Sequence, residues 1–165
     1  MAEIAELTAD DLVYDLGCGD GRIVIGAVQH SGCRGVGFDI DPERIKESIA
    51  NAIASGVSER VEFREQDIFT VDLSQSTVVM MYLLPWMVAK LEPQFEQMKP
   101  GSRIVTQDYW IEQVRPQRVI RVNVATENNP DAFYMLYMYT TPLERDASME
   151  RTKPPQPSDA INPAQ

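Results

Sequence analysis

The sequence predicts one α/β domain built on a doubly wound, mostly parallel seven-stranded sheet that closes with an antiparallel hairpin. Two observations carry this prediction. Short apolar, strand-like runs alternate with helix-like segments over most of the chain, as in parallel strands joined by crossover helices. Towards the C-terminal end, two strand-like runs follow one another with only a short loop between them, and such a pair forms a hairpin.

The first part of the chain supplies three strands and two helices. Strands are expected at residues 12–16, 34–40 and 61–65. A helix follows the first strand from Arg22 to about Gln29, where a glycine turn starts it. A second helix opens with Asp41 as N-cap and Pro42 at its first helical position, and it ends before Gly56.

The second part adds two parallel strands, one helix and the hairpin. The run at 77–84 is apolar without a break, which is typical of a strand covered on both faces. A helix-like segment follows from Pro85 to Met98, and Pro93 is expected to interrupt it. The remaining strands are expected at residues 103–107, 117–126 and 132–140.

The domain is expected to span residues 1–142, because 165 residues with 44% hydrophobic content suffice for one core. Residues 143–165 are polar and rich in proline, so we expect a disordered tail. Residues 2–8, A-E-I-A-E-L-T, resemble the end of a helix. No apolar run reaches the roughly 18 residues of a membrane span, and no signal peptide is visible, so a cytoplasmic location is expected.

The charge and the metal-binding residue types limit the possible partners. A net charge of −10 argues against general nucleic-acid binding, which needs a basic patch, and is compatible with a basic substrate. The single histidine, His30, is expected at the surface. No histidine or cysteine cluster has metal-ligand spacing, so no metal is expected. The oligomeric state is left open.

Residues 13–22, V-Y-D-L-G-C-G-D-G-R, place glycines at every second position directly after the first strand. Ligands of such sheets bind beyond the carboxyl ends of the strands. Gly17 can take a backbone conformation that other residues avoid, and Gly19 and Gly21 leave room for a ligand. Cys18 is expected to fill space in this loop, since nothing supplies a nucleophile there with a base.

An acid at the end of the second strand completes the pattern. Asp39 lies 22 residues after Gly17, where a carboxylate can accept hydrogen bonds from both hydroxyls of a ribose. Dinucleotide sites use G-x-G-x-x-G around a pyrophosphate, whereas this loop reads G-x-G-x-G after Asp15. A carboxylate does not favour the binding of an anionic pyrophosphate, but it does favour the binding of an amino group and a sulfonium. The loop therefore predicts a nucleoside-like cofactor with a cationic part.

The stretch D-L-G-C-G-D-G resembles the first motif of the class I S-adenosylmethionine-dependent methyltransferases, and F-D-I-D-P-E-R-I and E-Q-D-I-F are similar to their second and third motifs. With Y-L-L-P after the fourth strand, the chain also resembles small prokaryotic relatives of the ATP synthase c-subunit lysine methyltransferase family. The resemblance covers residues 12 to about 140. It implies a Rossmann-like fold, S-adenosylmethionine as cofactor, and a protein lysine as first choice of methyl acceptor, with small molecules second and nucleic acid third.

The resemblance also implies roles for individual residues. Asp15 would hold the methionine amino group, directly or through water, and Asp39 would hold the ribose. Asp67 would accept a hydrogen bond from the adenine amino group, unless it only starts a helix. Ile40 would lie on the adenine, with a place in the core as the alternative. The full set of expected cofactor contacts is Asp15, Gly17, Cys18, Gly19, Gly21, Asp39, Ile40, Asp67, Ile68 and Tyr82.

The acceptor side is expected where the fourth and fifth strands end. Tyr82 and Asp108 are the candidate catalytic residues, with packing roles as the alternative for both. Tyr82 could orient an acceptor amine, and Asp108 with Tyr109 and Trp110 could surround a cationic side chain. An amine must first lose a proton, to water or to a nearby carboxylate or tyrosine.

Two other functions remain open at this point. A nicotinamide-dependent oxidoreductase is disfavoured by the glycine spacing, by Asp15 and by the absence of a Tyr-x-x-x-Lys pattern. A non-catalytic module that binds the nucleoside but has lost its acceptor site would keep the same glycine loop. Binding without any methylated product would indicate that module.

Overall fold

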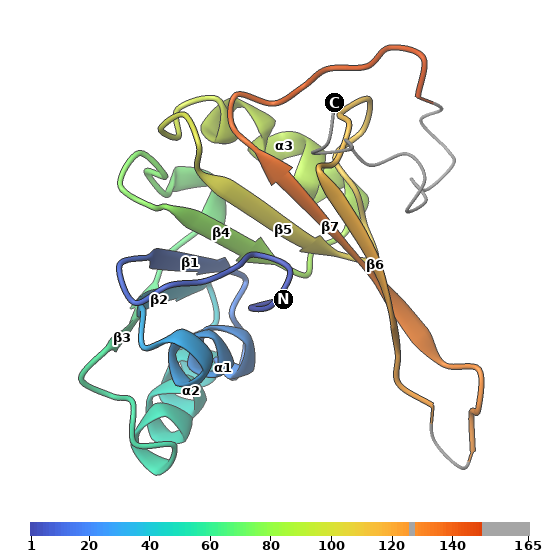
Figure 1. Ribbon diagram of the computed structural model, residues 1–165. Helices are drawn as coiled ribbons and strands as arrows, with labels where there is room; N and C mark the ends of the chain where they lie inside the picture. The colour runs from blue at the N-terminus through green and yellow to red at the C-terminus, as the bar shows by residue number, and fades with distance from the viewer. Residues whose placement is uncertain (126–127, 150–165) are drawn as a thin grey trace.

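The computed structural model describes residues 1–125 and 128–149, which form a seven-stranded sheet of order β3-β2-β1-β4-β5-β7-β6 (Figure 1). Strands β1 to β5 pair in parallel, and β6 and β7 form an antiparallel hairpin, as the sequence predicts. The hairpin joins the sheet through β7, which also runs antiparallel to β5. The strands are β1 (Leu12–Leu16), β2 (Arg34–Asp39), β3 (Val61–Glu65), β4 (Val78–Met81), β5 (Arg103–Gln107), β6 (Arg118–Asn123) and β7 (Phe133–Thr140).

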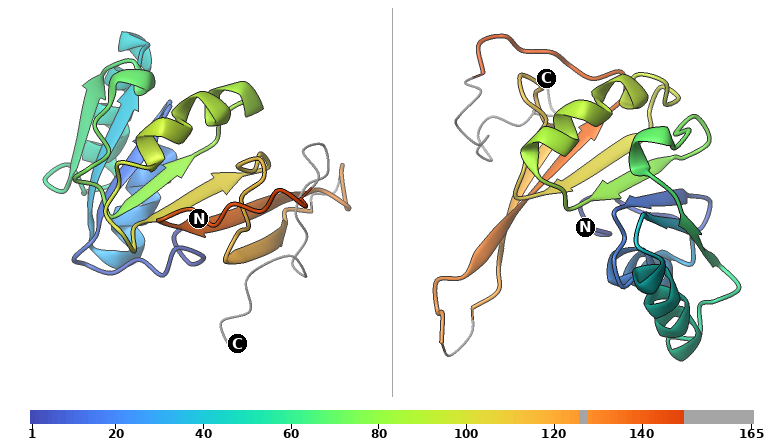
Figure 2. Two further views of the ribbon diagram at one scale, coloured as in Figure 1. Left: turned by 90° about the horizontal axis from the view of Figure 1, so that it is seen from above. Right: turned by 180° about the vertical axis from the view of Figure 1, so that it is seen from behind.

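Helices cover both faces of the sheet, which confirms the doubly wound prediction. The helices α1 (Arg22–Ser31) and α2 (Pro42–Ala54) lie on one face, and α3 (Pro85–Phe95) lies on the other (Figure 2). A short 3₁₀ helix, η1 (Ile68–Thr70), follows β3. The chain order reverses between β1 and β4, so the loops after these strands flank the point where ligands bind in such sheets.

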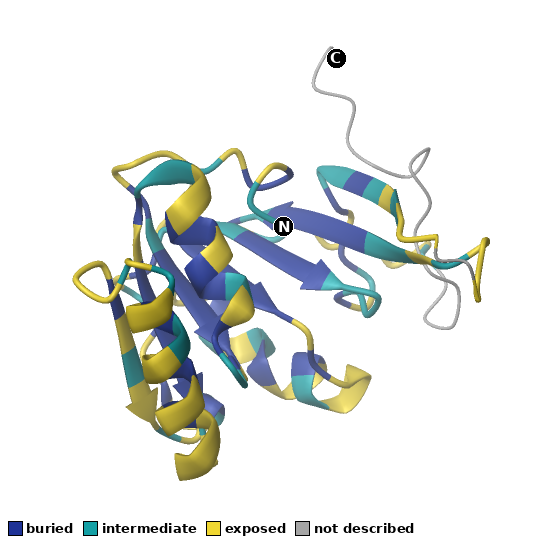
Figure 3. Cartoon of the chain, turned by 90° about the horizontal axis from the view of Figure 1, so that it is seen from below, coloured by how far each residue is buried: buried dark blue, intermediate teal, exposed yellow. Residues whose placement is uncertain are grey.

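Two apolar layers hold the sheet between the helices. Val24 and Val28 of α1 pack with Met80 and Val105 on one face. On the other face α3 buries its apolar side against the sheet, and the residues it contributes are Val88, Leu91 and Phe95. Strand β4 is buried at every position, as expected for a central strand, and the strongly buried strands stand out in Figure 3.

Helix α3 continues through Pro93, so the predicted interruption is wrong. The proline lies in the last turn, where its missing N–H removes a single hydrogen bond, and the buried apolar side of α3 outweighs that loss. The helix ends at Phe95 rather than Met98. Strand β4 also ends earlier than expected, at Met81, because the chain leaves the sheet there to start α3 at Pro85.

The hairpin forms as predicted, and its far end projects away from the rest of the domain (Figure 1). Strand β6 ends at Asn123, three residues before its predicted end, and the predicted end at Thr126 lies outside the described residues. Residues 2–6 form a turn, not a helix end, and bury Ile4 and Ala5 in the core layer under α1.

A polar cluster ties the amino ends of the central strands together. The carboxylate of Asp11 accepts a hydrogen bond from the Thr77 hydroxyl at 2.7 Å and pairs with the guanidinium of Arg103. The Thr77 hydroxyl oxygen in turn accepts a bond from the backbone N–H of Leu12 at 2.9 Å. This cluster, Asp11, Thr77 and Arg103, joins the segment before β1 to the starts of β4 and β5.

The chain beyond residue 142 begins in contact with the domain. Leu143 packs against the core layer under α3, and Arg145 pairs with Glu92 of that helix at 2.5 Å. Asp146 pairs with Arg115 at 2.5 Å. Residues 150–165, most of the tail predicted from the composition, lie outside the described residues. Within the described residues, no helix combines the length and apolar content needed to cross a bilayer.

Candidate active site

The glycine loop follows β1 and adopts a left-handed backbone at all three glycines, with φ values of 75° at Gly17, 54° at Gly19 and 80° at Gly21. The glycines differ in what surrounds them. A Cβ on Gly19 would meet nothing within 4 Å, so the space above it is open. A Cβ on Gly21 would lie 2.8 Å from the Phe63 ring and 3.0 Å from Ser48. The loop is therefore open at Gly19. At Gly21 a glycine is needed because β3 and α2 pack too closely for a side chain.

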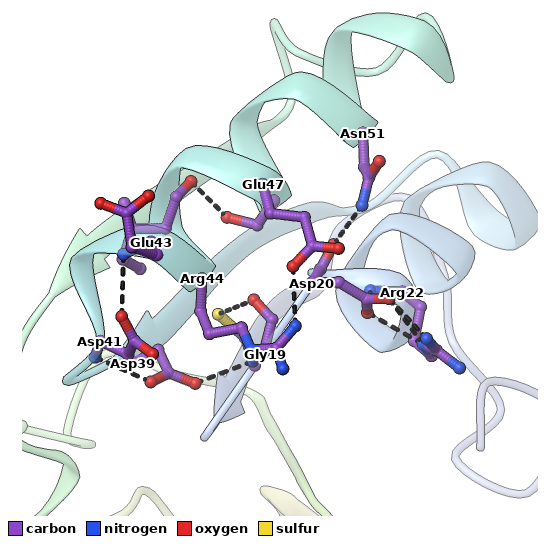
Figure 4. Close-up of polar contacts among 12 residues, drawn as sticks. Gly19, Asp20, Arg22, Asp39, Asp41, Glu43, Arg44, Glu47 and Asn51 are labelled. Carbon is purple, nitrogen blue, oxygen red and sulfur yellow. Dashed lines mark hydrogen bonds and ion pairs between the residues drawn. The ribbon is translucent and has the colours of Figure 1, made fainter.

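Asp39 fixes the loop from the end of β2. One of its carboxylate oxygens accepts a hydrogen bond from the Gly19 N–H at 2.9 Å, and the other accepts from the Asp41 N–H at 3.0 Å (Figure 4). The side chain of Asn51, on α2, donates to the carbonyl oxygen of Asp20 at 2.9 Å. The loop is thus held in place by β2 and α2 before any ligand binds.

Asp41 caps α2, as the sequence predicts. Its carboxylate accepts a hydrogen bond from the Glu43 N–H at 2.9 Å, and Pro42 follows it at the first helical position. The capping contact accounts for an acid at position 41 without any ligand. Asp39 is then the acid that contacts the glycine loop.

Asp15 is completely buried beneath the glycine loop. One carboxylate oxygen accepts a 3.3 Å hydrogen bond from the Val24 N–H in the first turn of α1, and the other has no partner in the described part of the chain. Burial, helped by the negative charges of Asp39 and Asp20, raises the pKa of Asp15 to about 7. A buried carboxyl with a free oxygen is suited to receive a cationic group.

Cys18 fills the interior of the loop. Its side chain is buried against β2, where a Cβ on Gly37 would lie 2.9 Å from the sulfur. Burial raises the pKa of the Cys18 thiol, and the neighbouring Asp15 and Asp39 raise it further. The thiol is therefore a poor nucleophile, as the sequence predicts.

The expected adenine contacts lie at the ends of β2 and β3. Ile40 is 69% exposed beside Asp39, so the alternative of a core isoleucine is wrong. Asp67 starts η1, where one of its oxygens accepts a hydrogen bond from the Phe69 N–H at 3.0 Å. Ile68 is buried in the core layer under α3. Ligand contacts for these three residues stay predictions.

Exposed aromatic side chains gather where β4 and β5 end. Tyr82 is 54% exposed and stacks on Tyr109, with ring centroids 6.5 Å apart and an angle of 13° between the planes. Trp86, in the first turn of α3, is 59% exposed and lies 6.0 Å from the ring of Phe69. Sequence reasoning placed Trp86 in the helix without a role. The signal was a pair of large apolar residues, Leu84 and Trp86, flanking the proline that starts the helix.

Asp108 joins the end of β5 to the hairpin. Its N–H donates to the Met135 carbonyl oxygen at 2.8 Å, and its carboxylate accepts from the Met135 N–H at 2.9 Å. The backbone at Asp108 is left-handed, with φ 59°. One carboxylate oxygen of this candidate catalytic residue is thus engaged in holding β7 beside the rim.

The comparisons with known proteins agree with this geometry. The chain matches the ANTKMT methyltransferase domain family over residues 15–118. A protein-lysine N-methyltransferase of Saccharolobus islandicus is 41% identical over 138 residues, which cover 82% of this chain and 86% of that protein. The ATP synthase c-subunit lysine N-methyltransferase of Rattus norvegicus is 33% identical over 94 residues, 56% of this chain and 43% of that protein.

A solved structure is similar over nearly its whole length. It is the RNA methyltransferase of Salinibacter ruber in complex with S-adenosyl-L-homocysteine, and it matches with a TM-score of 0.76 and 38% identity over 92% of both chains. The glycine loop with its buried acid, the acid after β2 and the sheet order fit the same cofactor. The chain belongs to the ANTKMT methyltransferase domain family and is an S-adenosylmethionine-dependent methyltransferase.

Proposed function

We propose that this enzyme transfers the methyl group of S-adenosylmethionine to the ε-amino group of a lysine in a protein substrate. The relative from Saccharolobus islandicus, which shares 41% identity over most of both chains, supports this acceptor. The net charge of −10 favours a basic substrate over a polyanion. The observation that carries the proposal is the stacked pair of Tyr82 and Tyr109, which offers aromatic faces to a cation beside the glycine loop.

The cofactor contacts follow from the loop. The free oxygen of Asp15 would accept a hydrogen bond from the methionine ammonium, and the ion pair would restore the charged form of this buried acid. Each oxygen of Asp39 accepts one backbone bond and keeps a lone pair for a ribose hydroxyl. The open space above Gly19 admits the ligand to the loop. Ile40 offers an exposed apolar side chain for the adenine face.

When bound, the cofactor supplies an electrophilic methyl group on a sulfonium. The protein aligns the acceptor with this methyl group and keeps water away from the approach path. The lysine ammonium must reach the rim and lose a proton, which passes to solvent at the exposed edge. The Tyr82 hydroxyl, which is free of hydrogen bonds in the described residues, would then orient the amine lone pair.

The experiment that tests the proposal is a methyl-transfer assay on fractionated cell extract with S-adenosylmethionine labelled in its methyl group. Label that disappears after protease treatment but resists nuclease, together with an increase of about 14 Da on lysine in peptide mass spectra, is the expected result. The Asp39→Ala variant serves as the control without productive cofactor binding. The solved relative from Salinibacter ruber is described as an RNA methyltransferase, and label removed by ribonuclease instead of protease would replace lysine by RNA as the acceptor.

A further inference from the structure

The loop after β5 is held in a strained shape. Two of its residues that are not glycine, Asp108 and Gln113, have left-handed backbones with φ values of 59° and 54°. Such conformations are unfavourable for residues with a side chain and persist where the surroundings impose them. They cluster at binding and catalytic sites. The stretch between them, residues 109–112, carries two aromatic side chains and one acid.

Contacts on both sides fix this stretch. Asp108 exchanges two hydrogen bonds with Met135, and the Ile111 N–H donates to the buried hydroxyl of Tyr139 at 3.0 Å. The ring of Trp110 packs edge-on against Tyr137, with centroids 6.4 Å apart. The stretch is therefore rigid before any substrate arrives, and its surface has a defined shape.

The stretch lines a pocket together with the first turns of α3. The pocket is a shallow depression open to solvent, with a cavity volume of only about 30 Å³, and its walls are Pro85, Ala89, Tyr109, Trp110 and Glu112. Glu112 is exposed, and no cationic side chain among the described residues pairs with it. Aromatic faces beside an unpaired carboxylate form a site for an ammonium or guanidinium group.

The position of the pocket relates it to the methyl acceptor. Leu83, next to Tyr82, abuts the glycine loop, since a Cβ on Gly17 would lie 2.8 Å from its side chain. Tyr109 lies one strand further from that loop and stacks on Tyr82. Neighbouring strands are about 4.8 Å apart, and alternate side chains of an extended peptide are about 6.8 Å apart. The 6.5 Å between the two rings is close to that spacing, so a peptide that presents its acceptor lysine at Tyr82 would bring the side chain two residues away to Tyr109, a wall of the pocket.

We propose that the pocket of Pro85, Ala89, Tyr109, Trp110 and Glu112 binds a lysine or arginine side chain two residues from the acceptor lysine and thereby selects basic substrate segments. This inference rests on the proposed lysine methylation. It assigns Glu112 as a specificity-determining residue that does not take part in the transfer. The guanidinium or ammonium would pair with the Glu112 carboxylate while its aliphatic stem lies against Trp110.

The test uses 11-residue peptides with one central lysine in a glycine-serine background. Arginine, its uncharged stand-in norleucine, or glutamate is placed two residues before or after the lysine. The wild-type enzyme is expected to methylate one arginine peptide with a kcat/KM at least about fivefold above the norleucine peptide, mainly through KM. The Glu112→Gln variant should reduce this ratio to less than about twofold and leave the norleucine rate unchanged.

The control variant is Glu59→Gln, which removes an exposed acid before the edge strand β3, four strands away from β5. It should keep the full preference for arginine. Methylation of all peptides at equal rates, or a preference that survives Glu112→Gln, would overturn the inference and leave lysine methylation standing. If calorimetry shows that S-adenosylhomocysteine binds but no lysine peptide is methylated, both the acceptor class and the inference are wrong.

Discussion

The backbone N–H of Gly19 donates a 2.9 Å hydrogen bond to the carboxylate of Asp39, 20 residues later in the chain. This contact means that the acid expected to hold the ribose also shapes the glycine loop. Because the second carboxylate oxygen accepts from the Asp41 N–H, the loop and the start of α2 converge on one side chain. Charge-assisted bonds to backbone N–H groups are among the stronger hydrogen bonds in proteins. The cofactor site is therefore partly assembled in the free enzyme.

Replacing Asp39 by alanine should lower the affinity for S-adenosylhomocysteine by at least about tenfold, because both the ribose contact and the support of the loop are lost. Calorimetric titration measures this change. The matched control is Asp41→Ala, which removes the helix cap and about 1 kcal/mol of stability but should keep the affinity within about twofold. An unchanged affinity for Asp39→Ala would remove this residue from the site.

Asp15 should make the stability of the free enzyme depend on pH. Its pKa of about 7 in the folded protein lies above the ordinary value of 3.8, so the folded state holds the proton more tightly. The resulting stabilisation is complete below about pH 4 and is lost as the pH rises through 7. Asp15→Asn removes this dependence, so urea unfolding at pH 8 should find the variant roughly 2–4 kcal/mol more stable than the wild type.

The same substitution should weaken the binding of the cofactor, so Asp15→Asn should raise stability and lower affinity at the same time. An amide cannot form the ion pair with the methionine ammonium, so Asp15→Asn should bind S-adenosylhomocysteine at least about tenfold less tightly at pH 8. For the wild type, the affinity should increase from pH 6 to pH 8 as Asp15 loses its proton. A pH-independent affinity would exclude a direct ion pair at Asp15.

The substitutions of Gly19 and Gly21 should differ in their cost because only Gly21 is packed against the core. Gly19→Ala leaves the core untouched and should cost about 1 kcal/mol of stability from backbone strain. Gly21→Ala adds a methyl group against Phe63 and Ser48 and should cost about 3 kcal/mol. Thermal unfolding without ligand measures both. Equal losses in the two variants would contradict the different surroundings of these glycines.

At Asp108, substitution by asparagine and by alanine should have different effects. The side-chain amide in Asp108→Asn would keep an oxygen for the Met135 N–H, and asparagine tolerates a left-handed backbone, so methyl transfer should stay within about threefold of the wild type. Asp108→Ala loses the contact and should reduce the rate more than about tenfold. This pattern would make Asp108 a positioning residue. A large loss with asparagine and a changed pH profile would instead identify it as the base.

The cluster at the amino ends of the strands should matter for stability alone. Asp11→Ala removes the only carboxylate that pairs with Arg103 in the described residues and the 2.7 Å acceptor of the Thr77 hydroxyl, and should cost about 3 kcal/mol. Although burial opposes ionisation, hydrogen bonds from Thr8 and Thr77 and the charge of Arg103 hold the pKa of Asp11 below its usual value. The stabilisation should therefore be present above pH 3.8 and be lost as the pH falls below it. The affinity for S-adenosylhomocysteine at neutral pH should not change.

The order of strands and helices along the chain could be predicted from the sequence because local periodicity and turn residues determine each element. The hairpin, for example, follows from two β-rich runs joined by a loop too short for a helix. The continuation of α3 through Pro93 could not be predicted, because the cost of the proline is local whereas the burial of α3 against the sheet depends on residues far away in the chain.

The site was predictable where a residue acts through a motif and not where it acts through a distant partner. Asp15 and Asp39 stand at fixed places relative to the glycines, so their positions could be inferred from the spacing. The packing role of Gly21 depends on Phe63, 42 residues away, and the contact of Asp108 depends on Met135 in the hairpin. The pocket beside Tyr109 forms only because the loop after β5 lies against α3, and no local sequence pattern indicates this contact.

The cluster of Asp11, Thr77 and Arg103 lies at one end of the central strands, and the aromatic rim lies at the other. The polar cluster that stabilises the fold is thus separated from the substrate-facing rim by the length of the strands. Evolution or a designer can exchange rim residues such as Trp86 or Glu112 without disturbing what keeps the strands in register. A fold in which stabilising residues and substrate-binding residues are separated in this way should acquire new methyl acceptors readily while it keeps the same cofactor.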